Sequence, residues 1–470
     1  SFTDRGPLWS LSSAGTSPSY SPPGGRFYLS GYHMVDYLNR TRGDDAFARI
    51  IRYQGTHPFR MPGKAFRHVA KTSPERFYRE FLADFNARAD SIRAVARATG
   101  LPEGEILRES ALDGFHSHFW TPEGRIRALR AGYERKTALL EIAPESGKTT
   151  REYDLGNMFS LKKIRPLPDG RLVYGRLFYH PLGETDLDVT DLEALNPVTG
   201  ERIRLTRGKH IYIPAVSPDG RTIVATARKG MWMDLLIMDA NGQNIRPLVS
   251  CEGLYWDSPS WSPDGSMVAA ALKEGGRNGI ALADVRDGGI RTLFAMDGHG
   301  YNDPSFSPEG RWLLFTSDLS GVWNVYAHDL QGNRTFRLTA VPYDSEEPLV
   351  SPDGRTLSFL YLSRGLNQVR TMPFAPEEGE QIQLAPGGPL TLPESSDRHG
   401  EIAESRGIPL RAYTPYLRAP AGGVDEDGST LGLFLLGGDP VGMNAYEITG
   451  LYGLDSKRFG YNVKFINRSL

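Results

Sequence analysis

The chain has 470 residues, which is enough for more than one domain. Its 54 basic and 56 acidic residues leave a net charge of −2, which gives no indication of nucleic-acid binding. The single cysteine, Cys251, excludes an internal disulfide, and no run of about 18 apolar residues is present that could cross a membrane as a helix. The chain starts with Ser1 and stops directly after a predicted strand, so we expect it to be part of a longer protein.

Residues 1–105 are predicted to be a helical segment, because apolar residues recur every three to four positions over residues 26–98, after an irregular stretch rich in Ser, Pro and Gly. Ser73 is expected to cap a long helix that begins at Pro74 and ends near Gly100. A shorter helix is expected after Asp44. The residues predicted to face inward are Phe77, Phe81, Phe85, Ile92 and Val95 on the long helix and Phe47, Ile50 and Ile51 on the short one.

A repeated phrase dominates the middle of the chain: Pro, any residue, an apolar residue, Ser, Pro, an acid, Gly. Four copies occur, and their acids are 45, 45 and 44 residues apart; two weaker copies precede them. A fixed period of this length is typical of propellers and solenoids. Residues 106–390 are therefore predicted to form six repeated β units. The turn acids of the six copies are Glu123, Asp169, Asp219, Asp264, Glu309 and Asp353.

The chemistry of the phrase predicts a tight turn between two strands. Proline presets φ at the second turn position, an acid tolerates the third, and glycine supplies the left-handed exit. Alternating strands follow, so each unit is expected to be a small antiparallel sheet, and such sheets bury their faces only by stacking around an axis. The turn acids are predicted to be structural.

These repeats resemble those of TolB-like six-bladed β-propellers, which are common in bacterial periplasmic proteins. The resemblance implies a mainly β fold: a six-bladed TolB-like propeller with an α-helical subdomain before it and an antiparallel β segment after it.

The helical segment resembles the C-terminal helical part of gluzincin (peptidase-MA-like) metallopeptidases, on residues 28–38, 58–60, 65–66 and 77–81. In that family a His-Glu-x-x-His helix binds zinc, and its Glu activates water. This sequence contains no such motif, and the resemblance places the third zinc ligand upstream of Ser1. Tyr28 and His33 are candidate remnants of a peptidase pocket, with ordinary helix packing as the alternative. No cofactor or metal is expected in this chain, although the resemblance makes zinc a candidate for the longer protein.

Residues 391–470 are predicted to contain a linker and three strands in which apolar and small or polar residues alternate. Strands of about ten residues with this pattern are typical of transmembrane β-barrels. The segment also resembles the entry into bacterial surface-antigen barrels, on residues 413–416, Gly432, 439–442 and Tyr446. The resemblance implies attachment to the outer membrane. The alternative is a small water-soluble antiparallel sheet.

Aligning the six units suggests a binding ring. The residue seven positions before each turn acid is polar or aromatic, and equivalent positions of a propeller surround its axis. Such a ring could bind a cation, a basic peptide or the terminus of a partner; the alternative is a set of solvated loop residues. His116 and His118 are expected on one side of a strand, but two ligands do not make a metal site. The candidates are His116, Lys162, Tyr212, Asp257, Asn302 and Glu346, with the neighbouring Asp303 and Glu347.

The sequence therefore predicts a propeller that binds a protein or peptide partner at its channel face, in a periplasmic, outer-membrane-associated bacterial protein. No catalytic residue is assigned. The alternative is a fragment of a zinc metallopeptidase whose His-Glu-x-x-His half lies upstream, with the propeller gating or presenting peptide substrate. A prolyl-oligopeptidase-type hydrolase is rejected, because the Gly-x-Ser-x-Gly elbow of that enzyme class is absent.

Overall fold

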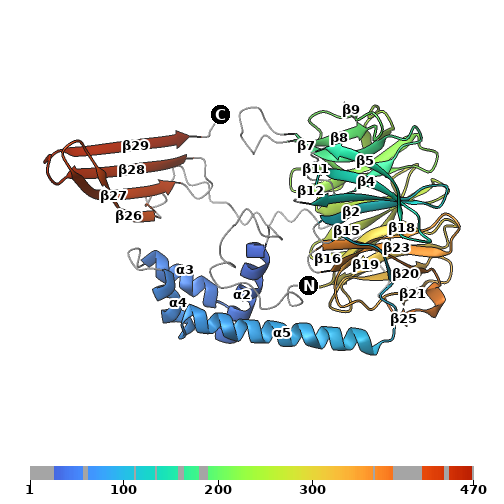
Figure 1. The fold of residues 1–470 in the computed structure, drawn as a ribbon, viewed down its shortest axis with the longest axis horizontal. Helices are drawn as coiled ribbons and strands as arrows, with labels where there is room; N and C mark the ends of the chain where they lie inside the picture. Colours follow the sequence, from blue (N-terminus) through green and yellow to red (C-terminus); the bar gives the residue numbers. More distant parts are fainter. Residues whose placement is uncertain are drawn as a thin grey trace. The chain divides into compact units, whose positions relative to one another are not determined.

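The computed structural model describes residues 26–56, 62–110, 113–132, 135–156, 163–178, 189–363, 366–384, 415, 417–438 and 444–467 (Figure 1). The chain divides into two compact units. One contains residues 1–6 and 88–396, and the other contains residues 7–87 and 397–470.

Four helices precede the sheets among the described residues: α2 (Arg26–Arg42), α3 (Ala46–Thr56), α4 (Pro62–Ala70) and α5 (Pro74–Ala98). As predicted, the Ser73 hydroxyl caps α5 by accepting the backbone N–H of Arg76 at 3.2 Å. Phe77 and Phe81 of α5 are buried against Tyr37 and Leu38 of α2. None of the described helices is both long and apolar enough to cross a membrane.

Two of the predicted apolar faces are wrong in part. On α3, Phe47 and Ile51 are exposed, and only Ile50 packs against the helical core. The helix begins at Ala46, which is fully buried. The side of α3 that carries Ala46 therefore faces the neighbouring helices, and the side that carries Phe47 and Ile51 does not. At the end of α5, Val95 is exposed because the adjacent Ala96 takes the buried position.

The β structure between residues 105 and 382 consists of six antiparallel blades, numbered here in chain order (Figure 1). Blades 3 and 4 are joined by one parallel bridge, between Met233 and Tyr255. Blade 1 contains β2 (Asp113–Trp120), β3 (Ile126–Gly132), β4 (Thr137–Ile142) and β5 (Thr149–Gly156); blade 2 contains β6 (Arg165–Pro166), β7 (Leu172–Phe178), β8 (Val189–Leu195) and β9 (Arg202–Arg204); blade 3 contains β10 (Ile211–Val216), β11 (Thr222–Lys229), β12 (Trp232–Asp239) and β13 (Arg246–Val249).

The remaining blades follow the same pattern, with the first strand of each blade nearest the axis. Blade 4 contains β14 (Leu254–Trp261), β15 (Met267–Glu274), β16 (Arg277–Asp284) and β17 (Ile290–Asp297); blade 5 contains β18 (Tyr301–Phe306), β19 (Trp312–Ser317), β20 (Asn324–Asp329), β21 (Arg334–Arg337) and β25 (Glu380–Ile382); blade 6 contains β22 (Ser345–Val350), β23 (Thr356–Ser363), β24 (Leu366–Pro373) and β1 (Glu105–Arg108).

Blade 6 is completed by a strand from the other end of the repeat region. β1 pairs antiparallel with β24, and Ile106 lies opposite Arg370. The first and last parts of the propeller are thereby held together by backbone hydrogen bonds. This strand was not predicted from the sequence, because it precedes the first repeat and carries no turn phrase.

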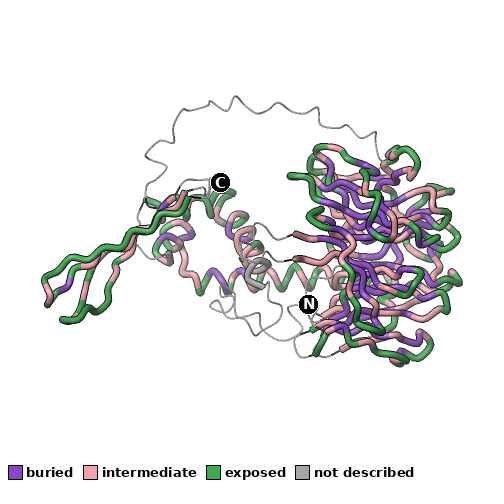
Figure 2. Tube along the Cα trace, turned by 90° about the horizontal axis from the view of Figure 1, so that it is seen from above, coloured by how far each residue is buried: buried purple, intermediate pink, exposed green. Residues whose placement is uncertain are grey.

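The core of the propeller is divided among the interfaces between blades. Each of the six pairs of neighbouring blades encloses its own cluster of buried apolar side chains. Trp256 lies fully buried between blades 3 and 4, and Phe359 between blades 5 and 6. Figure 2 shows the buried residues concentrated in the propeller strands. A blade covered on both faces by its neighbours is the arrangement that the repeat predicted, and the mainly β, propeller fold is confirmed.

The repeated phrase forms the turn that its chemistry predicts. The Ser217 hydroxyl donates to Asp219 at 2.6 Å and accepts the backbone N–H of Thr222 at 3.0 Å, and Gly220 has a φ of 70°. The hydrogen bond from Ser217, with the backbone N–H of Arg221, lowers the pKa of Asp219. The same bonds recur in the turns at Asp264 and Asp353. These carboxylates stabilise the turns through their hydrogen bonds.

The C-terminal sheet contains four antiparallel strands, one more than predicted: β26 (Leu417–Val424), β27 (Ser429–Gly438), β28 (Asn444–Gly453) and β29 (Phe459–Asn467). β26 was missed because Pro420, Gly422 and Gly423 disguise its strand pattern. The register places the alternating side chains of β27–β29 on common faces. One face, called here the apolar face, consists of Leu431, Leu433, Tyr452, Phe459, Tyr461, Val463 and Phe465, all exposed.

Candidate binding site at the propeller axis

The predicted ring residues lie on the innermost strands of the blades. His116 on β2 and Glu346 on β22 are exposed, whereas Tyr212, Asp257 and Asn302 are half-buried. Lys162 lies outside the described residues. The two imidazoles of His116 and His118 do not share a side of β2. A register shift between Phe115 and Ser117 leaves His116 exposed and His118 fully buried.

A second ring, one residue further along each strand, was missed as a set. Its six members come one from each blade, and every one is buried. Sequence reasoning included Asp303 and Glu347 only as neighbours of the first ring. We call this set the axial ring: Ser117, Lys163, Ile213, Ser258, Asp303 and Glu347.

A β-bulge explains why the second ring reaches the axis. The strand register shifts at this position in blades 4, 5 and 6, where Ser258, Asp303 and Glu347 have φ of 50°, 51° and 49°. In a regular strand, Asn302 and Asp303 would point to opposite sides. Here the Ser258 hydroxyl contacts the side chains of both, at 2.9 and 3.3 Å. The prediction assumed that side chains alternate strictly along each strand, and it therefore found only the first ring and missed the axial ring.

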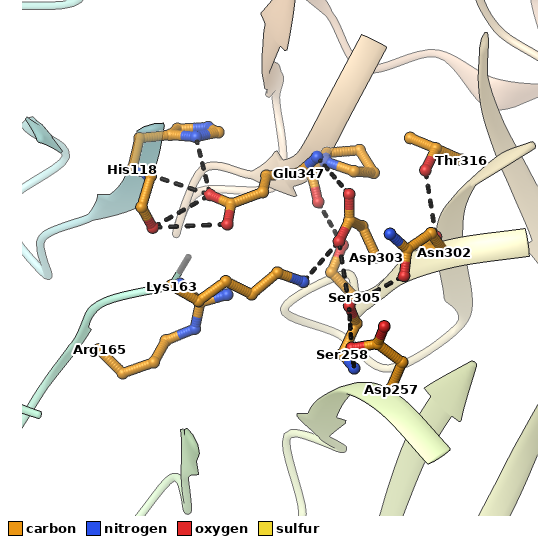
Figure 3. Close-up of polar contacts among 12 residues, drawn as sticks. His118, Lys163, Arg165, Asp257, Ser258, Asn302, Asp303, Ser305, Thr316 and Glu347 are labelled. Carbon is orange, nitrogen blue, oxygen red and sulfur yellow. Dashed lines mark hydrogen bonds and ion pairs between the residues drawn. The ribbon is translucent and has the colours of Figure 1, made fainter. Parts of the chain in front are cut away.

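A buried ion pair crosses the axis from blade 2 to blade 5. Lys163 Nζ donates to Asp303 Oδ1 at 2.5 Å, and both side chains are more than nine-tenths buried (Figure 3). Asp303 Oδ2 also accepts the backbone N–H of Glu347 at 3.0 Å. Burial opposes ionisation, but the charge of Lys163 and these hydrogen bonds outweigh it and lower the pKa of Asp303. The Asp303 carboxylate therefore stays ionised, and its hydrogen bond with Lys163 links opposite blades.

Glu347 makes the corresponding link between blades 6, 1 and 2. Its carboxylate accepts the Ser117 hydroxyl at 3.1 Å and the backbone N–H of His118 at 3.2 Å (Figure 3). Ser117 Oγ in turn accepts the backbone N–H of Ile164 at 3.3 Å. Side chains thus satisfy backbone groups that the bulges leave unpaired.

One part of this network has the order of a catalytic triad. His118 Nε2 lies 2.9 Å from Ser358 Oγ, and His118 Nδ1 lies 3.7 Å from Glu347 Oε2. However, His118 and Ser358 are fully buried, and Ser358 Oγ also accepts the indole N–H of Trp120. A nucleophile must contact its substrate, and the buried Ser358 hydroxyl is not accessible to one. The three side chains join blade 1 to blade 6.

Two cavities lie on either side of the axial ring. The larger, about 570 Å³, is lined by residues of blades 2 to 4, and the predicted ring residues Tyr212 and Asp257 are among them. The smaller, about 220 Å³, is lined by Lys163, Asp303 and Glu347 and by residues beyond them toward the turns, such as Pro218. Along the described strands, the buried axial ring lies between the residues that line only the larger cavity and those that line only the smaller one.

The larger cavity has an aromatic and apolar wall. Tyr212, Trp232 and Tyr255 line it together with Met231, whose side chain is 80% exposed at the tip of the β11–β12 hairpin. Burial and the charge of Asp257 raise the pKa of Tyr255, so its hydroxyl remains protonated. A concave apolar wall with a few polar groups is typical of a binding site.

Glu346 gives the mouth of the axis a charge that changes near neutral pH. The protein atoms around this exposed side chain remove part of its hydration, and Asp303 and Glu347 add negative charge. Together they raise the pKa of Glu346 to about 7. The carboxyl is therefore partly protonated at pH 7 and becomes fully ionised only above it.

The peptidase candidates lie in the helical unit. Tyr28 falls on α2, and its side chain lies outside the described residues. His33 is half-buried on the same helix, where its ring packs edge-on against Phe85 with centroids 5.3 Å apart. No group of three or more His, Cys, Asp or Glu side chains able to hold a metal ion occurs in the described part of the chain.

Residues 184–387 match the family model of the TolB beta propeller domain. The chain contains a TolB-like β-propeller domain. The match covers the whole region of the four strong repeats and begins within blade 2, and the structure adds blade 1 and the first strands of blade 2 before it. No curated protein is significantly similar to this sequence.

Solved structures with similarity to the TolB-like chain include TolB from Acinetobacter baumannii, with 19% identity and a TM-score of 0.39 over 62% of this chain and 69% of that one. Another is an oligogalacturonate lyase from Vibrio parahaemolyticus, with 15% identity and a TM-score of 0.42 over 58% of this chain and 81% of that one.

Proposed function

We propose that the TolB-like propeller is a non-catalytic interaction module that binds a segment of a partner protein in the larger cavity. The observation that carries the proposal is the wall of Met231, Trp232 and Tyr255 around that cavity. Met231 and Tyr255 are 80% and 40% exposed, although the blades around them bury most of their large apolar side chains.

Binding would cover these side chains. Trp and Tyr are enriched among the residues that dominate interface energies, and each square ångström of apolar surface removed from water contributes roughly 25 cal/mol. Asp257 supplies a polar contact: one carboxylate oxygen accepts the Ser258 N–H at 2.7 Å, and the side chain still lines the cavity. An apolar side chain of the partner, flanked by a hydrogen-bond donor, fits this arrangement.

Peptides selected from a random displayed library for binding to the whole chain test this proposal. Met231→Asp is expected to weaken their binding at least tenfold, or about 1.4 kcal/mol, because it places a charge in the apolar wall. Val198→Asp is the matched control, since Val198 is similarly exposed (76%) but does not line the cavity. Equal affinities for both variants, measured by calorimetry, or a selection that yields no peptide sensitive to Met231, would contradict the assignment.

We also propose that the protein works in the periplasm and attaches to the outer membrane through the C-terminal sheet. The TolB-like domain supports the first part, because the repeats resemble those of periplasmic proteins. The apolar face supports the second, since Phe459, Tyr461 and Phe465 are more than 60% exposed on it. Aromatic side chains gathered on one sheet face suit the boundary of a bilayer.

Flotation with phosphatidylethanolamine–phosphatidylglycerol vesicles tests the attachment. Tyr461→Lys is expected to reduce the bound fraction severalfold, because it puts a charge on the apolar face. Asn462→Lys, on the opposite face of the same strand, should leave binding unchanged. If both variants float like the unmodified chain, or if the unmodified chain does not float, the sheet is a water-soluble element and the proposal is wrong.

A further inference from the structure

The helices α3 and α4 belong to the most one-sidedly charged part of the chain. Residues 46–74 contain no Asp or Glu, whereas six Lys or Arg residues occur there. The whole chain has a net charge of only −2, so this concentration is local. The six are Arg49, Arg52, Arg60, Lys64, Arg67 and Lys71.

The structure gathers part of this charge around a hollow. A cavity of about 400 Å³ lies between α3 and the end of α4, and Arg49, Arg52, His68 and Lys71 line it. None of the described residues that line it carries a carboxylate. The rings of Tyr53 and His68 stack beside it, with centroids 4.3 Å apart and an angle of 21° between their planes. The hollow therefore has basic walls and a flat aromatic side.

Most of the basic side chains in this hollow are not neutralised. Arg49 is held, because its Nε lies 2.9 Å from Asp45 and its Nη2 donates to the carbonyl of Arg42. Arg52 and Lys71 make no ion pair within the described part of the chain. Two exposed cations without an ion pair among the described residues, Arg52 and Lys71, thus line the hollow beside Arg49, whose charge is balanced by Asp45.

We infer that this hollow is a binding site for a phosphate group. A guanidinium presents paired N–H donors that match phosphate oxygens, and lysine adds a mobile point charge. Phe47 and Ile51, exposed on α3, would contact the acyl region if the phosphate belonged to a lipid headgroup. This site is independent of the propeller cavity and of the function proposed for it.

Calorimetric titration of the whole chain with pyrophosphate tests the site, together with flotation on phosphatidylglycerol vesicles. The double variant Arg52→Ala, Lys71→Ala is expected to bind each probe at least tenfold more weakly than the unmodified chain does. Arg67→Ala is the matched control, because Arg67 is an exposed cation of α4 outside the hollow. Circular dichroism verifies that each variant keeps its helices.

The two probes separate the sources of the phosphate. Tenfold weaker pyrophosphate binding by the double variant, but not by Arg67→Ala, supports a site for free phosphate compounds. The same difference seen only on vesicles, and enlarged by Phe47→Ala with Ile51→Ala, supports a lipid headgroup. If Arg67→Ala weakens the binding of either probe as much as the double variant does, the binding depends only on the overall positive charge of the helices, and the inference is overturned. It is also overturned if neither probe binds.

Discussion

Replacing Lys163 with methionine is expected to lower the free energy of unfolding of the propeller by about 3–5 kcal/mol. The variant leaves the Asp303 carboxylate buried without its cation, while Ser258 and Glu347 still supply only neutral donors. The urea midpoint, followed by tryptophan fluorescence, measures the loss. Six of the seven tryptophans lie in the propeller, so the signal reports this unit.

Two controls separate charge burial from the loss of a lysine. Lys136→Met breaks an exposed pair with Asp154 between neighbouring strands, and we expect no measurable change. Adding Asp303→Asn to Lys163→Met should recover much of the loss, because the amide carries no charge and still accepts the Glu347 N–H. A single variant as stable as the unmodified protein, or a double variant less stable than the single, would show that the pair does not hold the blades.

The propeller could be predicted from sequence because its information is local and repeated. Each Ser-Pro-acid-Gly phrase specifies its own turn through bonds within six residues, as Ser217 and Asp219 show. The spacing between phrases then fixes the amount of chain in a blade. Packing between neighbouring blades adds stability but does not alter that pattern, so counting repeats was enough to obtain the architecture.

The candidate site was predicted less completely, because its geometry depends on a departure from strand alternation. Counting back from the turn acid located Tyr212 and Asp257, which line the larger cavity. It did not show that the next residue also turns toward the axis, since the bulge at Ser258, Asp303 and Glu347 breaks the two-residue period. Pairing of Lys163 with Asp303, 140 positions apart, follows from closure of the ring and not from either local sequence.

Closure of the propeller ring depends on the short strand β1, and a substitution at Gly104 tests how much that strand contributes. Gly104 directly precedes β1, has a φ of 74°, and a Cβ placed there would lie 2.8 Å from the buried ring of Phe359. Gly104→Val is therefore expected to cost about 2–5 kcal/mol. Roughly 1–2 kcal/mol comes from forcing a branched residue into the left-handed region, and about 1–3 kcal/mol from overpacking against Phe359.

Comparison of Gly104→Val with Gly100→Val isolates the contribution of overpacking. Gly100 has a similar φ of 69° in the same connection, but a Cβ there meets nothing within 4 Å. Its substitution should cost only the backbone penalty, and it should leave the tryptophan-detected unfolding of the propeller nearly unchanged. Gly104→Val should shift that transition to lower urea and speed unfolding, because β1 detaches from β24 and withdraws Leu107 from the apolar cluster between blades 6 and 1. Equal propeller midpoints for the two variants would mean that pairing of β1 with β24 contributes little, and that the buried contacts of Lys163 and Glu347 at the axis close the ring.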